Sequence, residues 1–313
     1  MISEKYISLG KTEIKISPIG LGIMQWGDIK TPNQPDIEIK KDIQEIFRVS
    51  LDMGVYFFDT AEIYGNGQSE RNLGLCLKEA SEKIVVASKF MPFPWRLSKR
   101  ELRSALNASL KRLGLVNLDL YQIHWPFPPV PIKNWMDAMA DAFKEGLIRA
   151  VGVSNYSAHQ TEIAFDMLSK QGIPLASNQV KYSLLDRHPE KFGLVDLCKK
   201  LNVTIIAYSP LEKGILTGKY TSENPPAGYR YWRYSKSFLK KIELLLNELN
   251  EIGKNHGGMS PAQVSLNWLT SKGVVPIPGA KNMLQAKENA GAMGWQLSSN
   301  EVEQLDIISE SIL

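Results

Sequence analysis

Cysteine is scarce in this sequence of 313 residues, and no stretch of it is long and apolar enough for a membrane helix. The two cysteines, Cys76 and Cys198, cannot form a disulfide framework, so we expect a reducing compartment. A transmembrane helix needs about 18 consecutive apolar residues, and no run approaches that length. The start of the chain is charged and lacks the apolar core of a secretory signal. The expected location is therefore the cytoplasm, with no membrane partner.

The charge is too balanced and too dispersed to indicate a nucleic-acid partner. The chain carries 37 Lys and Arg residues against 33 Asp and Glu residues, which gives a net charge of +4. A nucleic-acid-binding protein usually concentrates its basic residues on one face or in one segment. Because 43% of the residues are hydrophobic and 22% are charged, the composition indicates a globular protein with a full core.

Motifs for a metal ion and for the commonest nucleotide-binding loops are missing. The four histidines show no H-x-x-x-H or H-E-x-x-H spacing and the cysteines lie far apart, so we expect no metal ion. The glycine pairs at 20–22 and 65–67 lack the third glycine of a G-x-G-x-x-G loop. The stretch from Gly214 to Lys219 is one residue too short for a P-loop, so any nucleotide must be held in another way.

Short apolar segments rich in β-branched residues alternate with helical patterns along the chain. Most are continuously apolar, as strands of a parallel sheet covered on both faces usually are. This alternation predicts a closed (β/α)8 TIM barrel, with an open doubly wound sheet as the alternative. No linker or shift in composition divides the chain, so we expect a single domain over residues 1–313. The eight expected strands are 19–26, 55–61, 84–90, 118–125, 148–155, 175–182, 203–210 and 274–280.

Local signals add detail around these strands. Residues 6–17 hold a Leu-Gly-Lys turn between apolar residues, which predicts an N-terminal β-hairpin. Apolar residues recur every three or four positions over residues 238–252, which predicts one helix there. The longest irregular stretch, 221–235, follows the seventh strand and is rich in aromatic residues. Serines followed three positions later by Glu or Gln predict helix starts at Ser98, Ser157, Ser260 and Ser298.

Polar side chains follow the apolar strands, at the end of a barrel where active sites lie. Asp59 ends the second strand with Tyr64 just beyond it, Lys89 ends the third, and His124 ends the fourth. Each of these residues alone has an ordinary structural interpretation, such as a helix cap or a packed ring. The recurrence of polar groups at consecutive strand ends favours a functional site. Later strands end in Ser154, Asn155, Asn178, Gln179, Tyr208, Ser209 and Lys281.

The first four of these side chains form a set that can polarise a carbonyl group. A Lys89 ammonium stabilises phenolate and so lowers the pKa of Tyr64, while Asp59 can keep Lys89 charged. His124 can donate a hydrogen bond to a substrate oxygen. None of the four is a source of hydride, so the site needs a reductant, and nicotinamide is the simplest choice.

Extended motifs around these residues resemble those of the aldo-keto reductase family over essentially the whole chain. The stretches 94–96 and 291–295 look most like plant and cyanobacterial members, which include pyridoxal reductases. The matching motifs are Asp59-Thr60-Ala61-x-x-Tyr64-Gly65, Ser88-Lys89, the runs 119–125, 152–155, 178–183, 208–211 and 277–281, and Gln285 with Asn289.

The resemblance implies an enzyme that reduces aldehydes or ketones to alcohols with NADPH. Tyr64 would donate the proton and Lys89 would tune its pKa. Asp59 would hold Lys89, and His124 would orient the carbonyl. Lys281 favours NADPH over NADH because a cation there would meet the 2′-phosphate, although a lysine point charge leaves NADH possible. The implied cofactor residues are Ser154, Asn155, Gln179, Tyr208, Ser209, Pro210, Leu211, Gly214, Leu216, Lys219, Gly279, Ala280, Lys281, Gln285, Glu288 and Asn289.

Aromatic residues after four of the strands predict a wall for a flat or apolar small-molecule carbonyl substrate, although some of them could simply pack loops. These residues are Trp26, Trp95, Trp125 and Trp232. The alternative function is a regulatory subunit of the same fold that binds the cofactor and turns over little. No heptad or amphipathic extension in the sequence indicates an assembly surface for such a role.

Overall fold

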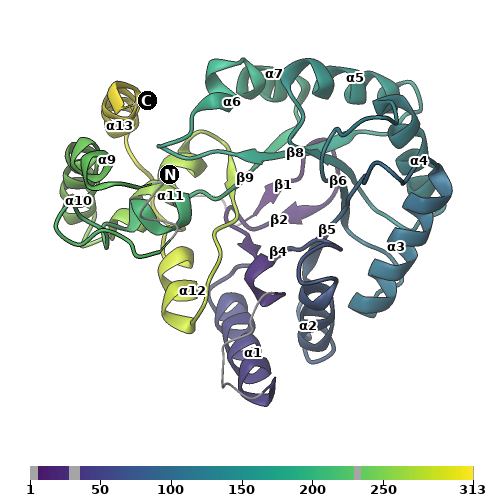
Figure 1. Cartoon of the computed structure of the whole chain (residues 1–313), viewed down its shortest axis with the longest axis horizontal. Coiled ribbons are helices and arrows are strands. Elements are labelled where there is room, and N and C mark those ends of the chain that lie inside the picture. Colours follow the sequence, from purple (N-terminus) through teal and green to yellow (C-terminus); the bar gives the residue numbers. More distant parts are fainter. Residues whose placement is uncertain (1–5, 28–35, 229–233, 313) are drawn as a thin grey trace.

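The computed structural model describes residues 6–27, 36–228 and 234–312, and its centre is a ring of parallel strands. Helices surround this ring, and a small hairpin lies across its middle in the view of Figure 1. Each of the eight strands lies within one of the segments expected from the sequence. The strands, which pair in sequence order, are β3 (Leu21–Gly22), β4 (Phe57–Asp59), β5 (Val85–Phe90), β6 (Leu120–Ile123), β7 (Val151–Ser154), β8 (Leu175–Lys181), β9 (Thr204–Tyr208) and β10 (Val275–Pro276).

Two backbone hydrogen bonds join the first strand region to the last. The Gly20 N–H donates to the Pro276 carbonyl at 3.0 Å, and the Gly22 N–H donates to the Pro278 carbonyl at 3.1 Å. A side chain at Gly22 would place its Cβ 2.8 Å from the Ile277 carbonyl oxygen, so glycine permits this close approach. The sheet is therefore a (β/α)8 barrel as predicted, and the open doubly wound alternative is wrong.

The N-terminal hairpin is confirmed and packs on the amino ends of the barrel strands. Its strands β1 (Ile7–Ser8) and β2 (Lys15–Ile16) are antiparallel. The Gly10 N–H at its turn donates to Thr204 Oγ1, at the start of β9, at 2.7 Å. Apolar hairpin residues such as Leu9 and Ile16 are buried against the barrel interior. This packing leaves the opposite end of the barrel, where the strands finish, for a functional site.

Helices follow the strands around the outside of the barrel. The starts predicted at Ser157 and Ser260 are confirmed, because each serine hydroxyl accepts the backbone N–H three residues on. In the part of the chain that the structure describes, no helix is long and apolar enough to cross a membrane. The helices are α1 (Asp36–Asp52), α2 (Gln68–Leu77), α3 (Lys99–Leu113), α4 (Ile132–Lys144), α5 (Ala158–Ser169), α6 (His188–Lys191), α7 (Leu194–Leu201), α9 (Lys236–Lys241), α10 (Glu243–Asn255), α11 (Pro261–Ser271), α12 (Met283–Ala290) and α13 (Ser299–Ile312), with 3₁₀ turns η1 (Met24–Trp26) and η2 (Glu212–Thr217).

The single helix predicted over residues 238–252 is wrong, because α9 and α10 meet at Ile242. The backbone of Ile242 has φ −89° and ψ 0°, which departs from helical values. Its side chain and that of Leu245 are nonetheless fully buried. The apolar spacing therefore continues through the break, and a periodicity alone cannot reveal it.

Candidate active site

A cleft of about 790 Å³ opens at the end of the barrel where the strands finish. Loops after most of the strands contribute to its walls, so residues far apart in sequence meet there. Of the residues singled out from the sequence, the cleft is lined by Asp59, Tyr64, His124, Trp125, Ser154, Asn155, Gln179, Tyr208, Ser209, Pro210, Leu211, Gly214, Lys219, Gly279, Lys281, Gln285, Glu288 and Asn289.

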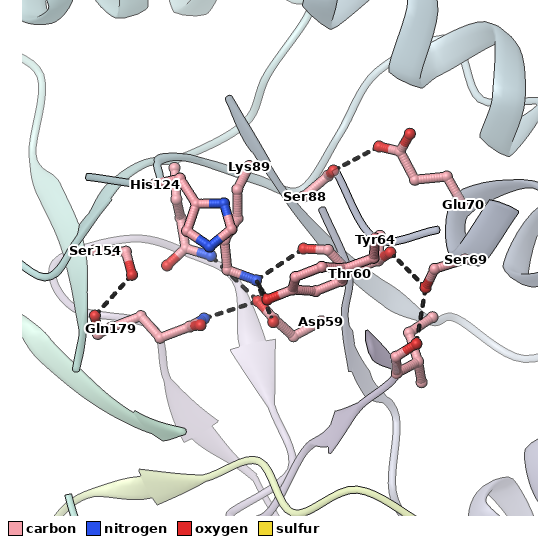
Figure 2. A network of polar contacts seen from close by, with 12 residues as sticks. Asp59, Thr60, Tyr64, Ser69, Glu70, Ser88, Lys89, His124, Ser154 and Gln179 are labelled. Atoms are coloured by element: carbon pink, nitrogen blue, oxygen red, sulfur yellow. Dashed lines mark hydrogen bonds and ion pairs between the residues drawn. The ribbon is translucent and has the colours of Figure 1, made fainter. Parts of the chain in front are cut away.

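Lys89 lies fully buried beside the cleft and joins two of the lining residues (Figure 2). Its ammonium forms an ion pair with the Asp59 carboxylate and donates to the Thr60 carbonyl at 2.8 Å. The same nitrogen lies 3.4 Å from the Tyr64 hydroxyl oxygen. Strands β4 and β5 are neighbours in the sheet, and this pairing brings the three side chains together. The grouping of Asp59, Tyr64 and Lys89 expected from the sequence is thus present as a geometry.

His124 lies beside Tyr64 in the wall of the cleft. The two ring centroids are 5.9 Å apart and the planes meet at 83°, edge to face. Among the described residues, the buried Nδ1 atom of His124 has no hydrogen-bond partner. A proton on Nδ1 would be an unsatisfied buried donor, which favours the neutral tautomer with its proton on Nε2.

The electrostatics of the group follow from burial and from the single ammonium. Burial raises the pKa of Tyr64 above its ordinary value, and the nearby Lys89 offsets only part of that rise. Burial opposes the charge on Lys89, but Asp59 and Tyr64 outweigh it and raise the pKa of the ammonium. Burial together with Lys89 lowers the pKa of His124 to about 3. The expected lowering of the Tyr64 pKa by Lys89 is therefore present but does not prevail.

Two glutamine amides complete the surroundings of Asp59, and neither contact was expected from the sequence, which assigned Gln179 to the cofactor and no role to Gln122. Gln179 Nε2 and Gln122 Nε2 donate to Asp59 Oδ2 at 2.8 and 3.2 Å. The sequence motif included Gln122, but no role was assigned to it. Side chains alternate along a strand, so Gln122 shares the inward face of β6 with Leu120 and points toward the same interior. That period of two is the signal that could have identified it.

A chain of hydrogen bonds links the polar residues at the ends of β7, β8 and β9. Ser154 Oγ donates to the Gln179 carbonyl at 2.8 Å. Asn155 Nδ2 donates to the His124 carbonyl at 3.0 Å, and Asn155 Oδ1 accepts from the Tyr208 hydroxyl at 2.9 Å. Asn155 has φ +62°, a left-handed conformation that asparagine tolerates better than most residues. These contacts fix the Tyr208 ring at the wall of the cleft.

The far end of the cleft is built around the start of α12. The Lys281 N–H donates to Gln285 Oε1 at 2.8 Å, and Asn289 Nδ2 donates to the Gly279 carbonyl at 3.2 Å. Gln25 Nε2 donates to the Ala280 carbonyl at 2.8 Å and so ties this end to η1. The other lining residues, for which the sequence indicated no role at the site, are Gly22, Ile23, Met24, Gln25, Ile63, Lys213, Thr217, Ile277 and Pro278.

The expected aromatic wall is only partly present. Trp125 lines the cleft and stacks on Phe127 with ring centroids 5.4 Å apart. Trp26 is wrong as a wall residue, since it is 1% exposed and belongs to the core. Trp95 is 69% exposed, stacks on Phe93 and does not line the cleft, so its contact with a substrate stays a prediction. Trp232 lies outside the described residues.

Two of the residues expected to contact a cofactor lie behind the lining. Leu216 and Ala280 are both fully buried, and neither lines the cleft. Leu216 packs in the core below η2, and Ala280 presents its carbonyl oxygen to Gln25. Neither side chain therefore reaches the surface of the cleft, and the contact of these two residues with a cofactor stays a prediction.

Comparison with known proteins extends over nearly the whole chain. The model of the aldo/keto reductase family matches residues 18–310. A chloroplastic pyridoxal reductase from Arabidopsis thaliana is 39% identical over 307 residues, covering 94% of this chain and 83% of the relative. The solved structure of the thermostable aldo-keto reductase Tm1743, in complex with the inhibitor epalrestat, has a TM-score of 0.78 and 35% sequence identity, covering 97% of this chain and 99% of that one.

A further solved structure with the same architecture is an aldo-keto reductase from Klebsiella pneumoniae in complex with NADPH. It has a TM-score of 0.75 and 26% sequence identity, and the alignment covers 96% of this chain and 94% of that one. The barrel, the cleft at its carboxyl end and these matches agree with the resemblance in the motifs. The chain belongs to the aldo/keto reductase family and is an oxidoreductase.

Proposed function

We propose that the protein reduces aldehydes or ketones to alcohols with NADPH, and that Tyr64 donates the proton. One observation supports this above all: the buried Lys89 ammonium contacts Asp59, Thr60 and the Tyr64 hydroxyl at once. A phenol with a raised pKa stays protonated at neutral pH and so has a proton to give. The family membership supports the same reaction class.

The cleft suits a dinucleotide in size and in the chemistry of its ends. Its volume of about 790 Å³ is near the upper end of the usual small-molecule range of about 300–1,000 Å³. Ser154, Asn155 and Gln179 would hold the carboxamide end, with Tyr208 against the ring. The Klebsiella relative was solved in complex with NADPH, which supports the same cofactor here. When bound, the reduced nicotinamide would supply the hydride.

The other end of the cleft would receive the adenosine half of the cofactor. Lys213 and Lys219 line the middle and would face the pyrophosphate. Lys281, at the far end, would meet the 2′-phosphate, which distinguishes NADPH from NADH. Because a lysine supplies a point charge and no bidentate contact, we propose a preference for NADPH and not an absolute requirement.

The residues of the chain divide the remaining work on the carbonyl group. His124, neutral and protonated on Nε2, donates a hydrogen bond that orients and polarises the carbonyl oxygen. Tyr64 passes its proton to the alkoxide oxygen as the alcohol forms. Lys89 stabilises the phenolate that Tyr64 becomes, and Asp59 keeps the ammonium in place.

The substrate end of the cleft favours a flat or apolar aldehyde. Its lining includes Met24, Ile63 and the Trp125 ring, which present apolar surface beside Tyr64 and His124. The relative from Arabidopsis thaliana is named a pyridoxal reductase, and pyridoxal is an aromatic aldehyde. We therefore propose aromatic aldehydes, pyridoxal among them, as the first substrates to test.

Steady-state oxidation of NADPH, and of NADH in parallel, with a panel of aromatic and aliphatic aldehydes tests the proposal. We expect turnover with at least one aromatic aldehyde and a lower KM for NADPH than for NADH. Uniformly slow turnover with every carbonyl, together with tight NADPH binding, would instead support the regulatory subunit of the same fold. The compartment is a separate expectation: we infer the cytoplasm, whereas the Arabidopsis relative is named chloroplastic.

A further inference from the structure

A partly buried ion pair that the proposed function does not use joins the Tyr64 loop, residues 60–67 between β4 and α2, to the segment that follows Lys89. The Glu62 carboxylate forms an ion pair with the Arg96 guanidinium and accepts the Met91 N–H at 2.7 Å. A second guanidinium nitrogen donates to the other Glu62 oxygen at 3.2 Å, so the contact is bidentate. The Glu62 side chain is 8% exposed and that of Arg96 is 23% exposed.

The contact between Glu62 and Met91 lies close in sequence to Tyr64 and Lys89, the two residues whose side chains must approach each other. Glu62 comes two residues before Tyr64, and Met91 comes two residues after Lys89. The Glu62 N–H also donates to the Lys89 carbonyl, at 3.4 Å. The side-chain contacts therefore continue the pairing of β4 with β5 beyond the last residue of β4. They join the two backbones close to where the Tyr64 hydroxyl and the Lys89 ammonium approach.

Arg96 is itself held in a shape that suits arginine and no other cation. Its guanidinium donates to the Met91 carbonyl at 2.9 Å. The same group lies 5.0 Å from the centre of the Phe90 ring and 5.5 Å from that of Phe93. A planar group with several donors can stack on rings and bind a carboxylate at once, whereas a lysine ammonium cannot. The Arg103–Glu145 pair, by contrast, is about half exposed on both sides.

The opposite side of the Tyr64 loop and the start of α2 contact the two residues that flank η1, Ile23 and Gly27. Gly65 has φ +56°, and a side chain there would overlap the carbonyl of Gly27. The Ser69 hydroxyl donates to the Ile23 carbonyl at 2.8 Å. The residues that flank η1 thus support one side of the loop, and the Glu62–Arg96 pair joins the other side to the segment after β5.

We propose that Glu62 and Arg96 are a positioning pair that holds the Tyr64 hydroxyl within reach of the Lys89 ammonium. The inference rests on the proposed roles of Tyr64 and Lys89. Neither member of the pair lines the cleft, so both act through the backbone they join. Loss of the pair loosens the Tyr64 loop, which the bond from the Glu62 N–H to the Lys89 carbonyl still joins to β5, and the contact between hydroxyl and ammonium lengthens.

A longer contact changes the titration of Tyr64 in one direction. The ionisable groups that face its ring are Asp59 on β4, Lys89 on β5, His124 after β6 and Tyr208 on β9. Of these, Lys89 favours the phenolate, Asp59 opposes it, and His124 is neutral. Weakening the Lys89 contact therefore moves the Tyr64 titration to higher pH.

The test compares Arg96→Met with Arg103→Met, which removes an exposed arginine from α3 as a matched control. Full-length protein carrying fluorotyrosine, whose phenol is more acidic, is titrated by fluorine NMR, and the residue 64 signal is assigned with Tyr64→Phe. We expect a higher titration midpoint in Arg96→Met, an intermediate one in Arg96→Lys and no change in Arg103→Met. In parallel, kcat for aldehyde reduction should fall by up to about 10²-fold in Arg96→Met, with the Kd for NADPH unchanged.

An unchanged midpoint in a folded Arg96→Met protein would overturn the inference. If that variant does not fold, Glu62→Gln decides by the same measurement, because it keeps an acceptor for the Met91 N–H and loses the ion pair. An equal fall of kcat in Arg103→Met would also contradict a positioning role. Because the NMR titration needs neither substrate nor cofactor, it still tests the pair if no carbonyl proves to be a substrate.

Discussion

The Lys89 ammonium nitrogen lies 3.4 Å from the Tyr64 hydroxyl oxygen, although Asp59 holds that ammonium in an ion pair. The arrangement sets two effects against each other on one phenol. Burial raises the pKa of Tyr64, and Lys89 lowers it, with burial prevailing. The phenol is protonated at neutral pH, and the Lys89 ammonium that would stabilise the phenolate lies next to its hydroxyl group.

Tyr64→Phe removes the proposed proton donor and leaves the ring. Losing one well-placed donor at a developing oxyanion costs about 10²–10³ in kcat, so we expect turnover to fall by at least that factor. NADPH binding, followed by fluorescence titration, should stay within a few-fold of the unchanged protein. A variant with the original kcat would remove Tyr64 from the mechanism.

Lys89→Met leaves the Asp59 carboxylate buried without its cation. Breaking a buried ion pair from one side costs about 3–5 kcal/mol, so the free energy of unfolding should fall by a comparable amount. The double variant Lys89→Met with Asp59→Asn should recover part of this loss, because no charge is then buried unpaired. Chemical denaturation of the unchanged protein, the single variant and the double variant checks the expected order of their free energies of unfolding. Equal stability of the single and double variants would contradict it.

Lys281→Glu places a negative charge where the 2′-phosphate would lie. We expect the KM for NADPH to rise much more than the KM for NADH, because only NADPH carries that phosphate. Lys287→Glu makes the same charge change on α12 at an exposed position outside the cleft lining, and it serves as the control. Equal changes for both cofactors in Lys281→Glu would show that this lysine does not read the phosphate.

Glu190 is the centre of a cluster that should make stability depend on acid. Burial opposes its charge, but Lys272, Tyr182 and Arg187 outweigh burial and lower its pKa. A carboxyl with a lowered folded-state pKa stabilises the protein above its ordinary pKa, and this stability is lost as the pH falls through the folded value. Glu190→Gln should therefore cost about 1–3 kcal/mol near neutral pH and progressively less in acid.

Thermal unfolding of the unchanged protein and of Glu190→Gln, followed from neutral pH into acid, measures the difference in stability between the two. Glu310→Gln is the matched control, because its 3.8 Å contact with Lys191 is largely exposed. It should change stability by no more than about 0.5 kcal/mol at any pH. A gap for Glu190→Gln that stays constant into acid would mean that the charge on Glu190 does not stabilise the fold.

The strands were predictable because burial on both faces leaves a plain signature, a run of apolar residues. The residues at their ends were predictable because an ionisable group such as Lys89 at the end of such a run needs a partner. The aromatic wall was harder to predict, because nothing in the sequence separates a core residue such as Trp26 from a lining residue such as Trp125. Both tryptophans follow apolar strands. Trp26 is buried because the chain turns into η1 at that point, and the sequence does not indicate this turn.

Contacts between distant loops were beyond sequence reasoning for another reason. Glu62 and Arg96 are 34 positions apart on different loops, and each alone looks like a surface charge. Their meeting depends on the pairing of β4 with β5 and on the course of the chain after Met91. Gln122 was predictable only in part. Its place on the inward face of β6 follows from the alternation of side chains along a strand, but its contact with Asp59 does not.

Closure of the ring by Gly20 and Gly22 with residues 276 and 278 has a consequence for how the protein is made. While the ribosome has not yet supplied the last strand, β3 and β9 both present unpaired edges, which can recruit strands from other nascent chains. A chain cut short before residue 275 should accumulate as aggregates and not as a smaller folded protein. The nascent chain is thus protected from aggregation only once translation has supplied the last strand, close to the end of the sequence.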